Sequence, residues 1–192
     1  MAQSSSLHRV FFALWPDVSL AQSLGQLAKE GARAWGGRPM SEATLHLTLA
    51  FIGEVAPARV PRLLELGAEV AGQTSFPVDF SLDDCGYWQR QHLLWLGCGP
   101  RAPALASLAE HLGLALEQAG FALEKRDFFP HVTLARRGGA GAEGPSWCER
   151  TRQEILPLAW RTHNFCLLQS CPDAAGAAYT TLGCWPGGES RP

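Results

Sequence analysis

The chain has 192 residues, of which 46% are hydrophobic and 18% are charged, and these proportions are typical of an ordinary globular domain. The formal net charge of −2 argues against an extended nucleic-acid surface, which needs a basic face, although a few arginines can still gather around one phosphate. The apolar run at residues 10–15 is too short for a signal-peptide core or a membrane span, so we expect a cytoplasmic protein. We expect one domain over residues 1–192, with two pseudo-symmetric lobes that share a core.

The first half of the chain alternates strands and helices. An apolar run at residues 9–15 predicts a buried strand, and Pro16-Asp17 then begins a helix with hydrophobic residues at helical spacing. Glycine and proline at residues 36–39 end this helix, and a strand over residues 45–52 follows. Hydrophobic spacing then predicts a helix over residues 57–71.

The second half repeats this order of elements. The same patterns predict a strand, a helix, a strand and a helix over residues 92–96, 103–119, 131–136 and 146–155. Further strands are expected over residues 76–82, 160–169 and 177–182.

The tetrapeptide His-x-Thr-Leu occurs at residues 46–49 and again at residues 131–134. The chain has only six histidines and eight threonines, so two such motifs are improbable by chance. Side chains two apart on a strand point to the same face, so each motif presents an imidazole beside a hydroxyl while its aliphatic residues face a core. This pattern indicates a functional site.

Both motifs come at the same point of a strand–helix–strand unit. Val10 precedes His46 by 36 residues, and Leu93 precedes His131 by 38 residues. Units of matching length that deliver the same motif indicate an internal duplication. The duplication predicts that His46 and His131 face each other across a cleft.

Two opposed imidazoles are suited to acid–base catalysis near neutral pH, because their unperturbed pKa lies near 6.5. Phosphodiester cleavage needs a base for the attacking water and an acid for the departing oxygen, and His46 and His131 can supply both. The hydroxyls of Thr48 and Thr133 can donate hydrogen bonds to phosphate oxygens, and Arg136 can add a charge-assisted contact. Paired histidines also occur in metal sites, but neither motif carries the Asp, Glu or third His that zinc requires. We therefore expect no metal and no cofactor.

Other candidate residues carry weaker signals. Arg126 is a second candidate for a phosphate contact, and Tyr87 and Trp88 could offer an aromatic face to a nucleobase. The carboxylates at residues 83–84 are interpreted as a turn before Gly86, because adjacent residues on a strand point to opposite faces.

The six cysteines include no Cys-x-x-Cys pair. Without a secretory signal we interpret them as reduced thiols, mostly buried.

With the duplicated motif in view, the chain resembles the two-histidine (2H) phosphoesterases over nearly its whole length. It is most similar to the bacterial RNA 2′,3′-cyclic phosphodiesterases, formerly called 2′-5′ RNA ligases. The segments that carry the resemblance are residues 9–14, 45–55, 94–97, 129–136, 168–170 and 179–180. The two histidine motifs are its specific part.

The resemblance implies a bilobal α+β fold in which two antiparallel sheets face a central cleft and helices lie outside. It also implies metal-independent hydrolysis of RNA 2′,3′-cyclic phosphate ends to 2′-phosphomonoesters. By resemblance, His46 is the proton donor and His131 activates water. Thr48, Thr133 and Arg136 match phosphate-contacting positions.

The chain departs from the family at Thr44, where relatives commonly have Asn before Leu-His. A hydroxyl can still hold this loop, so catalysis is expected to persist. Substrate positioning is the property that this change puts in question.

The expected partner is the 2′,3′-cyclic phosphate terminus of RNA, with tRNA fragments and small cyclic nucleotides both open as substrates, and the expected state is a monomer. Two other functions stay open. One is a ligase that runs the step backwards to form a 2′-5′ bond, and the other is a non-catalytic module that binds phosphate ends.

Overall fold

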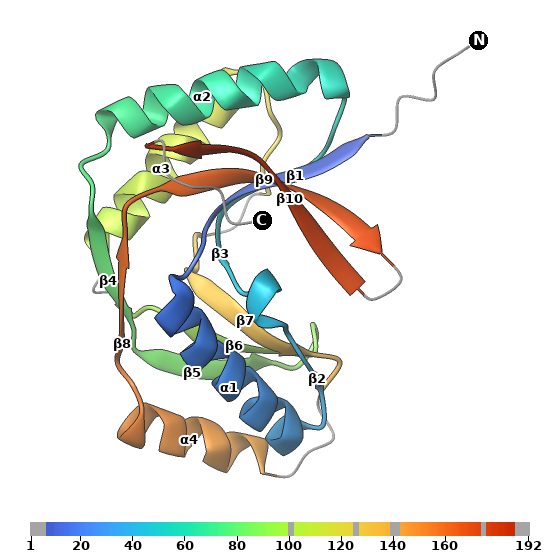
Figure 1. Cartoon of the computed structure of the whole chain (residues 1–192), viewed down its shortest axis with the longest axis vertical. Coiled ribbons are helices and arrows are strands. Elements are labelled where there is room, and N and C mark those ends of the chain that lie inside the picture. Colours follow the sequence, from blue (N-terminus) through green and yellow to red (C-terminus); the bar gives the residue numbers. More distant parts are fainter. Residues whose placement is uncertain (1–6, 100–101, 125–126, 139–142, 174–175, 187–192) are drawn as a thin grey trace.

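The expected α+β fold is confirmed by the computed structural model, which describes residues 7–99, 102–124, 127–138, 143–173 and 176–186 (Figure 1). The α-helices in this part of the chain are α1 (Val18–Trp35), α2 (Val60–Gln73), α3 (Pro103–Gln118) and α4 (Gly144–Glu154). Two 3-10 turns, Glu42–Thr44 and Pro57–Arg59, precede β3 and α2.

The strands make one large antiparallel sheet and one small one. The large sheet has the order β10-β9-β1-β3-β7-β6-β5, with β2 also paired to β7, and β4 and β8 form a separate pair. In chain order the strands are β1 (His8–Leu14), β2 (Arg38–Pro39), β3 (Leu47–Val55), β4 (Val78–Leu82), β5 (Asp84–Trp88), β6 (Leu93–Gly97), β7 (His131–Arg136), β8 (Leu158–Thr162), β9 (Phe165–Asp173) and β10 (Gly176–Trp185).

Helix α1 shows how local sequence sets an element. The Asp17 side chain accepts a hydrogen bond from the Leu20 amide at 2.8 Å, which caps the first turn. Leu20, Leu24 and other buried residues form one stripe of the helix. Gly36 ends it with a left-handed φ of 71°, a conformation that glycine adopts without steric cost.

The two halves of the large sheet meet at β3 and β7. These strands pair antiparallel at one residue pair, Leu47 with Val132. The resemblance implied two facing sheets, whereas here β10-β9-β1-β3 and β7-β6-β5 are joined into a single sheet at this point. The internal duplication stays an interpretation, and the strand order on either side of the joint is consistent with it.

The helices tie the two halves together. Helix α1 follows β1 in the chain but packs on β7 and β6, and helix α3 follows β6 but packs on β3 and β4 (Figure 1). One hydrophobic core contains buried residues from all four helices and from both halves of the sheet. Each half therefore depends on a helix that comes from the other half of the sequence.

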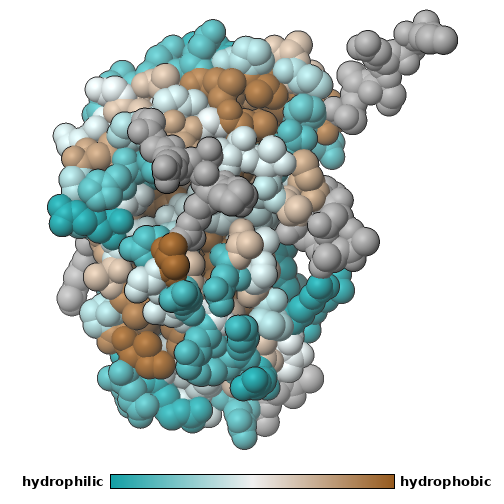
Figure 2. Space-filling view, viewed as in Figure 1, coloured by the Kyte–Doolittle hydropathy of each residue, from teal (hydrophilic) through white to brown (hydrophobic). Residues whose placement is uncertain are grey.

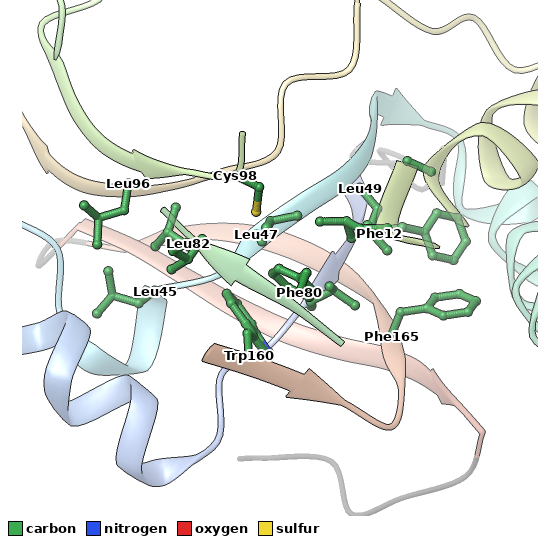
Figure 3. Close-up of a cluster of buried hydrophobic side chains, with 14 of the residues drawn as sticks. Phe12, Leu45, Leu47, Leu49, Phe80, Leu82, Leu96, Cys98, Trp160 and Phe165 are labelled. Atoms are coloured by element: carbon green, nitrogen blue, oxygen red, sulfur yellow. The ribbon is translucent and has the colours of Figure 1, made fainter. Parts of the chain in front are cut away.

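The core side of β3 supports the functional motif from behind. Leu47 is completely buried, Leu49 is nearly so, and both point toward Phe80 of the small sheet (Figure 3). Val132 of β7 is also completely buried. The predicted alternation of aliphatic and polar residues in both motifs is thus confirmed.

Two sequence-based expectations for the strands need correction. Of the two carboxylates expected to form a turn before Gly86, Asp83 lies between β4 and β5, whereas Asp84 begins β5. Gly86 lies inside β5, where a Cβ would collide with the Trp95 indole, so this glycine serves close packing. The single strand expected over residues 160–169 is divided into β8 and β9. The Thr162 hydroxyl donates to the Asn164 carbonyl at 2.7 Å and stabilises the turn between them.

The expectation that all cysteines are reduced was also wrong for one pair. Cys166 on β9 lies directly opposite Cys184 on β10, and the two form a disulfide. The free cysteines are Cys85, Cys98 and Cys148, which are buried, and Cys171, which is partly exposed.

The surface facing the viewer in Figure 2 is mostly hydrophilic, with hydrophobic side chains in separate groups. Among the described helices, none is long and apolar enough to cross a membrane.

Candidate active site

The joint between β3 and β7 brings the two histidine motifs together. Continuing the antiparallel register from the Leu47–Val132 pair places His46 opposite Thr133 and Thr48 opposite His131. Each histidine therefore lies across from the threonine of the other motif. All four polar side chains lie on the face opposite the core.

All five residues predicted for the site line one cavity of about 190 Å³. They are His46, Thr48, His131, Thr133 and Arg136. The prediction that the two imidazoles share a cleft is therefore confirmed. Arg126, the weaker candidate, lies outside the described residues.

Both imidazoles are oriented by the same hydrogen bond. Nδ1 of His46 lies 2.7 Å from the carbonyl oxygen of Thr44, and Nδ1 of His131 lies 2.8 Å from that of Phe129. Because a carbonyl can only accept, Nδ1 carries the proton and donates in each ring. The Nε2 atoms are thereby left for proton exchange with a substrate.

Thr44 holds the loop before the first motif, as expected. Its hydroxyl lies 3.0 Å from the Ser41 carbonyl, to which it donates, and 2.9 Å from the Ser41 hydroxyl. These contacts close the 3-10 turn, and the Thr44 carbonyl then orients His46. The Thr44 hydroxyl thus holds the loop that precedes His46.

An aromatic wall surrounds His46. The ring centroids of Phe11 and Tyr179 lie 5.1 Å from the imidazole, and that of Trp15 lies 5.7 Å away. Burial lowers the pKa of His46 to about 4, and the positive charges of Arg136 and His131 act in the same direction. The hydrogen bond to Thr44 opposes this shift. His46 is therefore neutral at pH 7 when no anion lies beside it.

His131 has a different aromatic neighbour. The Trp88 ring lies 4.7 Å from the imidazole in an edge-on arrangement, and Phe129 lies 5.9 Å away. Tyr87 instead stacks on Trp35 at 4.0 Å and lies outside the cavity lining. Of the two aromatic residues singled out in the sequence, only Trp88 reaches the site.

Two arginines at or near the site have no ion pair with a described carboxylate. Within the described part of the chain, neither Arg136 nor Arg9 forms an ion pair with Asp or Glu. The Arg9 guanidinium lies over the Phe51 ring at 5.0 Å, and Phe51 lines the cavity. The local charge therefore favours an anionic ligand.

A larger cleft of about 370 Å³ continues from the cavity. The two share Thr48, Phe51, Trp88, Gln91 and His131, and helix α3 and residues 123–124 and 127–129 supply further walls. Among the described residues there is no group of three or more His, Cys, Asp or Glu side chains that could hold a metal ion.

A family model described as the 2′-5′ RNA ligase superfamily matches residues 16–173. The chain belongs to this superfamily. The match begins directly after β1 and contains both histidine motifs, so the resemblance seen in the sequence is confirmed.

Relatives within the superfamily are similar in sequence and in structure. The RNA 2′,3′-cyclic phosphodiesterase of Escherichia coli (strain K12) is 34% identical over 132 residues, which cover 69% of this chain and 73% of that protein. The enzyme of the same name from Thermus thermophilus is 27% identical over 182 residues, 91% of this chain and 87% of that protein. The crystal structure of E. coli LigT with 3′-AMP matches with a TM-score of 0.76 and 27% identity, covering 93% of this chain and 97% of that one.

The aromatic wall and Arg9 were missed in the sequence. Phe11 and Trp15 lie in a run of residues that is apolar at every position. Hydrophobic periodicity therefore cannot show which side chains of this strand face the cleft and which face the core. Tyr179 is far away in sequence and comes into place only through the pairing of β10, β9 and β1.

Proposed function

We propose that this protein hydrolyses RNA 2′,3′-cyclic phosphate ends to 2′-phosphomonoesters. The observation that carries the proposal is the cavity in which two imidazoles, two threonines and an arginine meet, each imidazole oriented through Nδ1. Relatives named RNA 2′,3′-cyclic phosphodiesterase support the substrate. We further propose that it acts as a cytoplasmic monomer without a metal or cofactor.

In this proposal the cyclic phosphate binds between the two strands. The hydroxyls of Thr48 and Thr133 donate to its non-bridging oxygens, and Arg136 offsets its negative charge. As water adds, negative charge on these oxygens grows, so the same contacts strengthen in the transition state. The cross-strand arrangement places one threonine beside each histidine.

The two imidazoles then divide the proton transfers. Nε2 of His131 accepts a proton from water while the water oxygen bonds to phosphorus. The bond from phosphorus to O3′ breaks, and Nε2 of protonated His46 donates a proton to O3′. The products are a 3′-hydroxyl and a 2′-phosphomonoester, and a proton returned from His131 to His46 through solvent restores the starting state.

This order of roles follows the resemblance to the family and places a demand on His46. With a pKa of about 4, this residue is neutral at pH 7 and cannot donate from Nε2. The bound phosphate must raise its pKa by offsetting the charge of Arg136, one of the causes that lower it.

The larger cleft accommodates the terminal nucleoside in this proposal. Trp88 lies beside His131 and at the boundary of both cavities, where a base can stack on it. The crystal structure of E. coli LigT complexed with 3′-AMP supports a nucleotide as the ligand of such a protein.

The test is product analysis on an RNA with a 2′,3′-cyclic phosphate end. We expect a 2′-phosphomonoester, and we expect His46→Ala and His131→Ala each to lower the rate about 10²–10⁴-fold, the usual contribution of a positioned acid or base. His163→Ala removes an exposed histidine outside the cavity and serves as the matched control. EDTA should leave the rate unchanged, because imidazoles carry both proton transfers.

Two other results of the product analysis would each identify a different function. A lengthened strand would identify a ligase, and retention of the RNA without turnover would identify a binding module. Wild-type rates in either histidine variant would overturn the paired mechanism.

The same variants test which histidine is the acid. A nitrophenyl phosphodiester releases a leaving group that needs little protonation. On this substrate the loss caused by His46→Ala should shrink, while that caused by His131→Ala should stay large. The reverse pattern would exchange the two roles.

A further inference from the structure

An open groove adjoins the catalytic cavity. We call it the arginine groove, and its lining is Gln91, His92, Leu93, Arg136, Arg137 and Gly138. Its volume is about 600 Å³, and it shares Gln91, Leu93 and Arg136 with the cavity. A chain bound at the catalytic phosphate can therefore continue into it.

The arginine groove carries two neighbouring cations. Arg136 ends β7 and Arg137 follows it in the chain, and both residues are exposed. Among the described carboxylates, none lies within ion-pair distance of Arg136 or Arg137. The positive charge of the groove therefore favours an anionic ligand.

The backbone of the groove is held in a costly conformation. His92 and Arg137 have φ values of 52° and 60°, and they are the non-glycine residues with positive φ in the described part of the chain. The two segments are connected by hydrogen bonds. The carbonyl oxygen of Gly138, the residue after Arg137, accepts from the Tyr87 hydroxyl at 2.7 Å and from His92 Nδ1 at 2.8 Å. Strained backbone of this kind clusters at binding sites.

The larger cleft has a different lining. Its described residues are mostly apolar or aromatic, and they include the carboxylates of Glu117 and Asp127. Carboxylates repel phosphate, so this cleft suits a nucleoside better than a phosphodiester chain. The two openings from the catalytic cavity therefore differ in what they can bind.

We propose that the arginine groove binds the phosphodiester backbone of the RNA immediately 5′ to its cyclic end, with Arg137 contacting the first upstream phosphate. This inference rests on the proposed function, because the groove opens from the cavity assigned to the cyclic phosphate. It makes an oligonucleotide end, rather than a cyclic mononucleotide, the preferred substrate.

The test compares adenosine 2′,3′-cyclic phosphate with a trinucleotide that ends in the same group. Arg137→Asn should lower kcat/KM for the trinucleotide about tenfold, the effect of one lost charge-assisted contact, and leave the mononucleotide unchanged. Asparagine tolerates the left-handed backbone at this position. Arg90→Asn is the matched control. Arg90 is exposed in the turn between β5 and β6, which supplies Gln91 and His92 to the groove, but Arg90 itself does not line the groove.

Two further measurements make the test specific to a phosphate charge. Replacing the upstream linkage with a neutral methylphosphonate should abolish the difference between wild type and Arg137→Asn. The wild-type kcat/KM for the trinucleotide should also fall more steeply with salt than that for the mononucleotide, by a logarithmic slope of about 0.7 per phosphate contact.

The outcomes separate this inference from the proposed function. If wild-type protein opens neither substrate, the proposed function fails. If it opens both and Arg137→Asn changes both equally or neither, only the arginine groove is refuted.

Discussion

At the scale of single residues, the two copies of one motif have acquired different surroundings. Both histidines donate from Nδ1 to a carbonyl two residues earlier, so their orientation is the same. Three aromatic rings pack around His46, whereas Trp88 and Phe129 are the aromatic neighbours of His131. Burial among these rings lowers the pKa of His46, so the role of acid proposed for it requires the negative charge of a bound phosphate.

The lowered pKa of His46 predicts a pH-dependent stability. Because its folded pKa of about 4 lies below the unfolded value of 6.5, the unfolded chain binds more protons between these values. The contribution is complete above pH 6.5 and is lost as the pH falls toward 4. Since the ring is only half-buried, we expect this loss to be about 1–3 kcal/mol.

Urea unfolding at pH 7.5 and pH 4.5 measures this effect. Wild-type protein should lose more free energy of unfolding between these pH values than His46→Asn, which cannot titrate. His163→Asn, at an exposed histidine, should behave as wild type. Equal losses in wild type and His46→Asn would contradict the assigned pKa shift.

At the scale of elements, the sequence was informative wherever a pattern has one structural meaning. The stripe of α1 and the alternation in β3 and β7 predicted those elements and the side of the sheet that carries the site. The carboxylates at residues 83–84 were only partly understood, because a pair of acidic residues can belong to a turn or, as Asp84 does, begin a strand. The arginine groove and the wall around His46 depend on pairing between distant strands, which residue spacing does not encode.

The disulfide between β9 and β10 illustrates the same limit and carries a stability prediction. Cys166 and Cys184 are 18 residues apart, and only the register of the two strands places them opposite each other. Closing a loop of this length in the unfolded chain corresponds to about 3 kcal/mol. Without reductant, Cys184→Ala should therefore unfold with a free energy lower by about this amount.

Unfolding with and without reductant provides the check. In reductant, wild type and Cys184→Ala should differ by much less, because the crosslink is absent from both. Cys171→Ala, which removes a free thiol on β9, the strand of Cys166, should match wild type in both conditions. A difference between wild type and Cys184→Ala that reductant leaves intact would show that packing, rather than the crosslink, is responsible.

At the scale of the whole molecule, the site lies where the two halves are joined. β3 and β7 pair at Leu47 and Val132, and the proposed catalytic residues His46 and His131 directly precede the members of this pair in the chain. Helices α1 and α3 each pack on strands of the opposite half. Part of the hydrophobic face of each half is covered by a helix from the other half, so the geometry of the site depends on both halves being folded.

This exchange of helices predicts one cooperative unfolding transition. Circular dichroism and tryptophan fluorescence should give coincident urea curves, because loss of one half exposes the core of the other. Leu47→Ala, at the completely buried joint, should lower the free energy of unfolding by about 2–5 kcal/mol without dividing the transition. Leu114→Ala, at a side chain that is 49% exposed, should change it by less than about 0.5 kcal/mol. Two separate transitions in either probe would mean that the halves fold independently, and the joint would then be a docking contact between them.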